Sequence, residues 1–254
     1  MTIVARHCQQ RVPRRGERAT VERCRGGTLP PVDWEEHAER EEGRYADGAE
    51  RISSEPDARQ KQLVRVAMAA TGAGLARLMQ GRRAEAAGWL ARSAERFRES
   101  FADAPPGSWG RLIGAVKARL LAGDWEGAEA DAHWALAQAP SDAESPIGRY
   151  AAVLAHLVLG EDAEARQLAD GLRREAESAF PRPVADAVAA LAGADADAYR
   201  EAAGQVLASF EERDAYLEDI PVADTVVVLE ALAARRGLAA GLRSPLLPEN
   251  PGVD

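Results

Sequence analysis

The chain has 254 residues, of which 46% are hydrophobic and only 5% aromatic, a composition that favours helices over strands. The formal net charge of −9 excludes nucleic acid as the default partner, because phosphate binding needs a basic surface. Every apolar run is shorter than the roughly 20 residues that span a bilayer, and the opening MTIVARHCQQRVPRR lacks the apolar core of a signal peptide. We therefore expect a cytoplasmic protein with no membrane partner.

Cys8 and Cys24 are too few for a disulfide framework. Together with His7 and His37 they would supply the ligand count of a zinc site, but no C-x-x-C or H-x-x-x-H spacing organises them. We expect free thiols in a reducing compartment, with no metal and no cofactor.

The first part of the chain, residues 1–57, differs from the rest. Residues 1–25 carry seven arginines and two glutamates, whereas residues 33–57 carry ten acidic residues and three arginines. The intervening GGTLPP breaks any helix. Asp33 then predicts an N-cap for a helix from Trp34 to about Ile52, with a glutamate three residues on to complete a capping-box pattern.

From residue 58 to 243, apolar residues recur at three- and four-residue steps, which predicts a nearly continuous series of amphipathic helices. Four stretches in this region repeat one pattern: LMQGRRAEA, LLAGDWEGA, LVLGEDAEA and ALAGADADA. In each, an apolar run ends at a glycine that can close a helix in the left-handed conformation. An alanine stands five residues later and is expected on the inner side of the next helix. The glycines are Gly81, Gly123, Gly160 and Gly193, and the alanines are Ala86, Ala128, Ala165 and Ala198.

The glycine spacings of 42, 37 and 33 residues lie in the range of helical-hairpin solenoids, in which each unit covers its apolar face by stacking on neighbours. The predicted fold is therefore all-α, a right-handed stack of about four antiparallel helical hairpins. An extended tail follows at 244–254. The first helices of the hairpins are expected at about 62–80, 109–122, 147–159 and 183–192.

Residues 112–140 resemble a tetratricopeptide repeat. The second half of that motif is matched in order, whereas Ala115 and Val116 match its first helix less well, and the other three units keep only the glycine and the first alanine. The resemblance implies a tetratricopeptide-like α-solenoid that binds a protein or peptide. The matching residues are Gly123, Asp124, Trp125, Ala128, Ala135, Leu136 and Pro140.

The ending LEALAARRGLAAGLRSPLLP (229–248) is similar to the close of a helical family of bacterial immunity proteins, the one numbered forty-nine among antidotes to polymorphic toxins. The stretch SWGRLIGAVKARLLAGD and the start IVARH are similar to it as well. This resemblance implies a protein that binds and neutralises a cognate toxin. The positions that carry it at the ending are Arg236, Gly237, Ser244, Leu247 and Pro248.

Motifs of catalysis are missing from the sequence: there is no G-x-S-x-G, G-x-x-x-x-G-K, H-E-x-x-H or Rossmann glycine set. The G-x-G of AATGAGLARL lies inside a helical stripe and is better explained by close helix packing. One alternative is an enzyme whose site combines His133, His156 and the carboxylates of 211–219. That alternative predicts a closed pocket with a histidine and a carboxylate within hydrogen-bond distance.

The favoured function is non-enzymatic protein binding on the concave face, which the first helices of stacked hairpins line. Arginine and aromatic residues are common interface anchors. For Trp109 and Tyr150 the alternative is a place in the core, and for the arginines it is ordinary solvation. A binder is expected to show a groove lined by Arg111, Lys117, Arg149 and Tyr150, without a convergent titratable pair. The full set of candidate partner-binding residues is Arg65, Trp109, Arg111, Lys117, Arg149, Tyr150 and His156.

Overall fold

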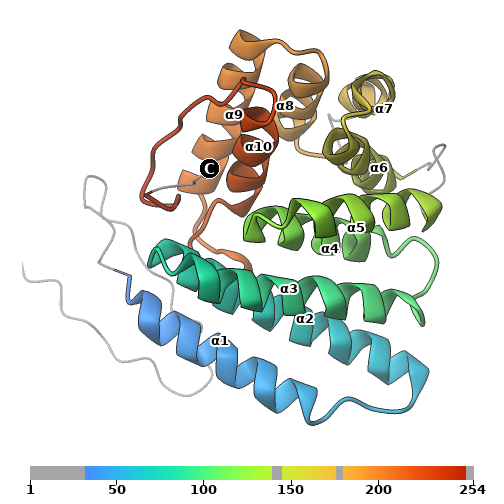
Figure 1. The fold of residues 1–254 in the computed structure, drawn as a ribbon, viewed down its shortest axis with the longest axis vertical. Helices are drawn as coiled ribbons and strands as arrows, with labels where there is room; N and C mark the ends of the chain where they lie inside the picture. The colour runs from blue at the N-terminus through green and yellow to red at the C-terminus, as the bar shows by residue number, and fades with distance from the viewer. Residues whose placement is uncertain (1–31, 139–144, 176–179, 250–254) are drawn as a thin grey trace, which may run out of the picture. The chain divides into compact units, whose positions relative to one another are not determined.

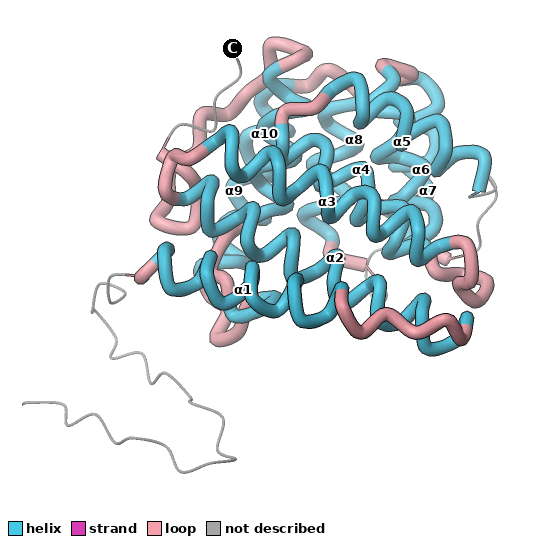
Figure 2. The backbone as a smooth tube through the Cα atoms, turned by 60° about the horizontal axis from the view of Figure 1, so that its bottom comes forward, coloured by secondary structure: helices cyan, strands magenta, loops and turns pink. Residues whose placement is uncertain are grey.

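The computed structural model describes residues 32–138, 145–175 and 180–249, and these ranges contain helices and loops but no strand (Figure 2). The all-α prediction is confirmed. The arginine-rich start, including Cys8, Cys24 and the IVARH stretch, and Pro140 of the repeat motif lie outside the described residues. The helices are α1 (Trp34–Ala49), α2 (Pro56–Met79), α3 (Arg83–Phe101), α4 (Trp109–Ala122), α5 (Trp125–Gln138), α6 (Pro146–Leu159), α7 (Asp162–Glu175), α8 (Arg182–Ala192), α9 (Ala196–Glu211), the 3₁₀ helix η1 (Leu217–Asp219) and α10 (Asp224–Ala234).

Helix α1 begins where the capping pattern predicts it. The Asp33 carboxylate accepts hydrogen bonds from the backbone N–H of Glu35 at 3.1 Å and of Glu36 at 3.0 Å, which satisfies two donors at the start of the helix. The helix ends at Ala49, three residues before the expected Ile52.

Charged side chains attach α1 to α2, and both helices belong to the same compact unit as the later ones. The Arg77 guanidinium, 5% exposed, donates to Glu35 Oε1 at 2.7 Å and to Glu42 Oε1 at 3.0 Å. Burial of one arginine among several carboxylates is tolerated because its charge is paired. The acidic stretch 33–57 thus lies with the helices from residue 58 onward.

Three of the four predicted corners have the expected backbone. Gly81, Gly123 and Gly160 have φ values of 73°, 72° and 74°, and each lies between the two helices of a pair. The alanines five residues later, Ala86, Ala128 and Ala165, are fully buried. A left-handed residue followed by a buried small residue therefore ends one helix and starts the next on its inner side, as the repeated pattern predicts.

The fourth corner differs from the prediction by one residue. Gly193 has a φ of −87° and the left-handed residue is Ala194, with a φ of 52°. Asp195 follows and caps α9 by accepting a hydrogen bond from Ala198 N–H at 3.0 Å. Because the turn closes one residue later, the buried position moves from Ala198, which is exposed, to Tyr199. The predicted roles of Gly193 and Ala198 are therefore wrong.

In Figure 1 the pair α4–α5 lies above α2–α3, and the pairs α6–α7 and α8–α9 lie side by side above α4–α5. The first helix α6 contacts the first helices α4 and α8, and α10 returns to pack against α4, α8 and α9. The segment after α10 also packs on this core: Ala223 N–H donates to Leu246 O at 2.9 Å, and Leu246 is 2% exposed. Among the described helices, none combines the length and the apolar character needed to cross a bilayer.

Candidate functional site

A groove of about 330 Å³ opens where α2, α4 and the start of α8 meet α9 and the chain that leads into α10. We call it the central groove. Its walls are mainly apolar, and three of the helices that form it are first helices of their pairs. Mostly apolar walls with a few polar groups are typical of binding sites. The lining includes Met68, Thr71, Gly72, Leu75, Lys117, Pro181, Pro183, Val184, Val206, Ser209, Phe210, Arg213, Tyr216, Glu218, Ile220, Val222, Asp224 and Thr225.

Lys117 supplies the central ion pair of this groove. Its Nζ lies 2.6 Å from Asp224 Oδ2 and 3.2 Å from Thr225 Oγ1, and its side chain is 16% exposed. Burial lowers the pKa of Lys117, but the charge and hydrogen bond of Asp224 outweigh burial, so the pKa is raised above its ordinary value. The side chain is therefore a protonated hydrogen-bond donor rather than a base. The central groove thus holds a titratable pair, Lys117 and Asp224, whereas a groove without such a pair was expected of a binder.

Tyr150 is 6% exposed and packs against Phe180, with ring centroids 5.1 Å apart. Burial raises the pKa of Tyr150, and the nearby charges of Lys117 and Asp224 act on it in opposite directions. Tyr150 is not among the residues that line the central groove. Its burial matches the alternative of a place in the core rather than an exposed contact.

One side of the groove is closed by residues 213–222, which we call the strap. The Tyr216 hydroxyl donates to Phe210 O at 2.9 Å, and Ile220 is 2% exposed. Glu218 and Asp219 adopt left-handed φ values of 54° and 57°, which cost free energy for residues with a Cβ. Contacts between the strap and neighbouring elements hold the backbone in this strained conformation.

Helix α1 holds the strained part of the strap. Arg40 Nη2 donates to the carbonyl of Glu218 at 3.0 Å, and the Arg44 guanidinium pairs with the Glu218 carboxylate. Arg44 also donates to Glu41 Oε2 at 2.7 Å, and Glu41 is fully buried. The buried carboxylate thus orients the arginine that fastens the strap.

Arg111 and Trp109 lie at the start of α4, away from Lys117. Six residues separate Arg111 from Lys117, which is about 240° around the helix. Arg111 Nη2 donates to Gln60 Oε1, while its buried Nη1 has no hydrogen-bond partner in the described ranges. Burial lowers the pKa of Arg111. Trp109 is half-buried and packs on the main core.

The other three candidates occupy separate places. Arg65 is exposed and lines a crevice of about 380 Å³ between α1 and α2, together with Arg44 and Arg51. The side chain of Arg149, on α6, lies close to Gly171 of α7. His156 Nδ1 lies 2.7 Å from Glu161 Oε2 at the corner between α6 and α7. The seven predicted residues therefore do not form one groove lining; Lys117 is the one among them that lines the central groove.

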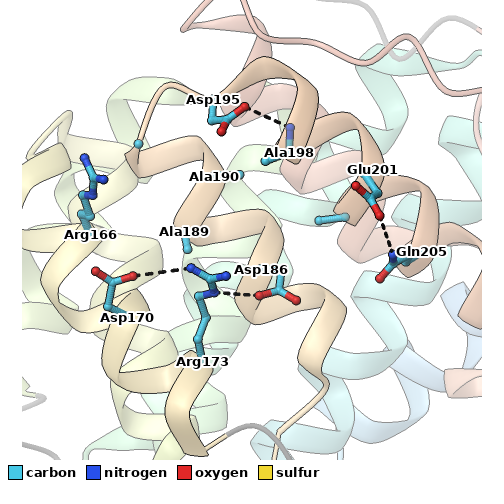
Figure 3. Close-up of a pocket in the computed structure, with 12 residues that line it drawn as sticks. Arg166, Asp170, Arg173, Asp186, Ala189, Ala190, Asp195, Ala198, Glu201 and Gln205 are labelled. Atoms are coloured by element: carbon cyan, nitrogen blue, oxygen red, sulfur yellow. Dashed lines mark hydrogen bonds and ion pairs between the residues drawn. The ribbon is translucent and has the colours of Figure 1, made fainter.

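A third groove, of about 390 Å³, lies between α7, α8 and α9 (Figure 3). Arg173 bridges its two sides by lying 3.8 Å from Asp170 and 2.7 Å from Asp186. The floor is made of alanines such as Ala189 and Ala190. Arg173, Asp170 and Asp186 thus form a partly exposed ion-pair cluster, and such clusters contribute little to stability. The sequence analysis did not predict this groove. The spacing of Arg166, Asp170 and Arg173, at steps of four and three residues, does indicate one charged face of α7.

The residues of the enzyme alternative do not gather in these grooves. None of the three grooves is lined by a histidine. His133 is exposed on α5, and the His156–Glu161 pair lies at a helix corner. Glu211 accepts a hydrogen bond from Ser244, and Glu218 pairs with Arg44. Over the described ranges, no cluster of three histidine, cysteine or carboxylate side chains could hold a metal ion.

Comparison of the chain with protein-family models, curated proteins and solved structures finds no match.

Proposed function

We propose that this protein is a non-enzymatic, protein-binding helical-repeat protein whose hairpins form a tetratricopeptide-like stack. The observation that carries the proposal is the central groove, in which α2 and the start of α8 present mainly apolar side chains and α4 contributes Lys117. In stacked hairpins the first helices line the concave, partner-binding side. An extended or helical segment of a protein partner would insert apolar side chains there.

The corners support the repeat assignment. Three pairs share a left-handed glycine, and the fourth uses Ala194 in the same geometrical role. The position of α10 also supports a defined site, because α10 packs on α4 and α8 and thereby bounds the groove. The raised pKa of Lys117 keeps its amine protonated, which argues against a role as a base or nucleophile.

Two neighbouring residues of α9 allow a matched test. Ser209 is exposed and lines the central groove, whereas Ala208 is exposed and is not among the lining residues. Ser209→Trp should fill the groove, and Ala208→Trp adds the same bulk beside it. Affinity capture followed by mass spectrometry should retain the same proteins with the wild type and Ala208→Trp, and lose them with Ser209→Trp. Equal capture by both variants would reject the groove as the partner site.

The ending supports an immunity protein as a second candidate. Arg236, one of the residues of the resemblance, donates from Nη2 to Leu157 O at 2.7 Å. The next residue, Gly237, has a φ of 68°, and Leu247 N–H donates to Ser244 O at 3.0 Å. The similar residues thus build an anchored ending rather than a loose tail. If a toxin is encoded beside this chain, co-expression should restore growth of cells that produce the toxin domain; continued killing would reject this candidate.

A further inference from the structure

The central groove adjoins the crevice of about 380 Å³ between α1 and α2. Arg44 lines the crevice, Glu218 lines the central groove, and the two side chains form an ion pair. Along α2, Val66 lines the crevice and Met68, two residues later, lines the central groove. Because the two depressions meet at these residues, one segment of a partner can contact both. We call them together the groove–crevice surface.

Positive charge is in excess on the groove–crevice surface, although the whole chain carries a net charge of −9. Its lining contains five cations and three carboxylates. One cation remains in excess when the adjoining Arg40, Glu41 and Asp219 are included. A positive, partly apolar surface on an acidic protein attracts an anionic partner. The lining cations are Arg44, Arg51, Arg65, Lys117 and Arg213, and the lining carboxylates are Asp47, Glu218 and Asp224.

The cations of the central groove belong to contacts within the protein. Lys117 Nζ lies 2.6 Å from Asp224 Oδ2. The Arg213 guanidinium lies over the ring of Phe210, 3.7 Å from its centroid, and its charge acts on Lys117. Because Asp224 balances Lys117 and Arg44 balances Glu218, Arg213 gives the groove its remaining positive charge. The groove thus offers apolar walls without a net negative charge that would repel an acidic partner.

The cations of the crevice are more accessible. Arg51 Nη2 lies 3.2 Å from Asp47 Oδ2, and the two side chains are 72% and 74% exposed. Such an exposed pair contributes little to stability, so Arg51 can exchange Asp47 for another carboxylate at little cost. Arg65 is exposed, and among the described residues it forms no ion pair. The crevice therefore places two arginines where carboxylates of a partner can reach them.

We propose that the groove–crevice surface binds an acidic peptide segment of a partner, with apolar side chains in the central groove and carboxylates on Arg65 and Arg51. The proposal rests on the proposed function in taking the central groove as the partner site. On α2, Arg65 and Leu75 are ten residues apart, a rise of about 15 Å. An extended segment of about five residues covers that distance, so a short peptide can occupy both depressions.

Hexapeptides with acetylated and amidated ends are the probes. Three glutamates precede Leu-Phe-Leu in one and follow it in another, because either chain direction fits the surface. In two matched peptides glutamines replace the glutamates, and in two more serines replace Leu-Phe-Leu. Calorimetric titration of the full chain should show one glutamate peptide bound about fivefold more tightly than its glutamine counterpart, the gain expected from two exposed ion pairs.

This gain should shrink as the salt concentration rises from about 0.05 M to about 0.5 M, because salt screens exposed charges. The serine counterpart should bind more weakly than the Leu-Phe-Leu peptide, since it offers nothing to the apolar walls. Equal affinities of the glutamate and glutamine peptides, equal affinities of the serine and Leu-Phe-Leu peptides, or no binding of any peptide would overturn the proposal.

Two matched pairs of variants locate the contacts. Arg65→Gln should weaken binding of the glutamate peptide about two- to threefold and leave the glutamine peptide unchanged. Arg200→Gln removes the same charge from α9, where Arg200 is 56% exposed and lines neither depression, and should leave both unchanged. Ser209→Trp should weaken binding of both peptides, and Ala208→Trp should not. A glutamate-peptide affinity that responds equally to Arg65→Gln and Arg200→Gln would contradict the assignment.

The outcomes also separate this inference from the proposed function. If the glutamate peptide binds as expected and Arg65→Gln weakens it while Ser209→Trp still captures the same proteins, the chemistry of the surface is right and its role as the partner site is wrong. If Ser209→Trp loses the proteins but the glutamate and glutamine peptides bind equally, the partner site is right and the preference for an acidic segment is wrong.

Discussion

The hydroxyl of Tyr199 donates a hydrogen bond of 2.7 Å to Glu230 Oε1 and joins α9 to α10. Tyr199 is fully buried and Glu230 is 7% exposed. The same carboxylate accepts backbone N–H groups from Ala240 at 3.1 Å and Gly241 at 2.9 Å. Burial raises the pKa of Tyr199, and the neighbouring carboxylate acts in the same direction, so the phenol remains a donor. The Tyr199 side chain, from the second helix of the fourth pair, thus binds the same carboxylate that holds the backbone of Ala240 and Gly241.

Replacing Tyr199 by Phe should destabilise the protein by about 1–3 kcal/mol, because a buried carboxylate loses a hydrogen bond that no solvent replaces. Urea unfolding measures the loss. Amide exchange at Ala240 and Gly241 should become faster, since both donate to the same carboxylate. Ala198→Ser, on the exposed neighbour, is the control and should change stability little. A Tyr199→Phe variant as stable as the wild type would refute the role of this bond.

Replacing Gly123 by Val should destabilise the protein by about 1–2 kcal/mol, because a β-branched residue resists the left-handed region. A Cβ at Gly123 meets nothing within 4 Å, so the loss comes from the backbone alone. The converse change, Ala194→Gly, should stabilise by up to about 1 kcal/mol because Ala194 has a φ of 52°. Thermal unfolding of both variants tests the two corners, and shifts of the same sign would contradict the assignment.

Replacing Glu218 by Ala should loosen the strap. The change removes the pairing with Arg44 but leaves the Arg40 hydrogen bond to the backbone carbonyl. With one fastening lost, the strained backbone should open more often, and amide exchange in residues 213–222 should accelerate. Global stability should fall by less than about 1 kcal/mol, because the pair is partly exposed. Glu212→Ala, just outside the strap, is the control and should leave the exchange unchanged; equal acceleration in both would reject the fastening role.

Stability should decrease on acidification through the ordinary pKa of histidine. Burial lowers the pKa of His37, with a further effect of Arg40, and its Nδ1 is buried with no hydrogen-bond partner in the described ranges. The unfolded chain therefore binds a proton at a pH at which the folded chain does not, so stability is lost as the pH falls below about 6.5. The urea midpoint should be lower at about pH 5.5 than at about pH 7.5.

His37→Gln should reduce this pH dependence, and His133→Gln, on an exposed histidine, should not. The contribution of His37 should remain below about 1 kcal/mol because the ring is only partly buried. An identical pH dependence in His37→Gln would show that other groups cause it.

The sequence predicted the helices well because their signals are local. Apolar periodicity placed α4 at residues 109–122 and α6 and α8 within a residue of their observed starts. The N-cap of α1 at Asp33 was readable for the same reason. The error at Gly193 has a physical cause. Glycine permits a left-handed conformation without requiring it, and because Asp195 caps α9, the left-handed residue is the one before it, Ala194.

The site was only partly predictable. Lys117 was selected because it lies on a first helix, but its partner Asp224 is 107 residues away in the chain. Nothing in the spacing of EDIPVADT indicates that this stretch closes a groove against α1 and α2. Tyr150 was predicted to line the same groove but lies in the core. Apolar periodicity cannot distinguish a core tyrosine from an interface tyrosine, since both occupy the apolar side of a helix.

By itself, the amino-acid sequence determined that the chain is helical, where most helices begin and end, and which small residues face inward at three corners, because these properties depend on neighbours three to five residues away. The tertiary structure alone decided that α10 returns to α4 and α8, that Asp224 meets Lys117, and that the strap closes the groove on α1. These contacts join segments far apart in the chain, and their free energy depends on burial and charge pairing that no local pattern records.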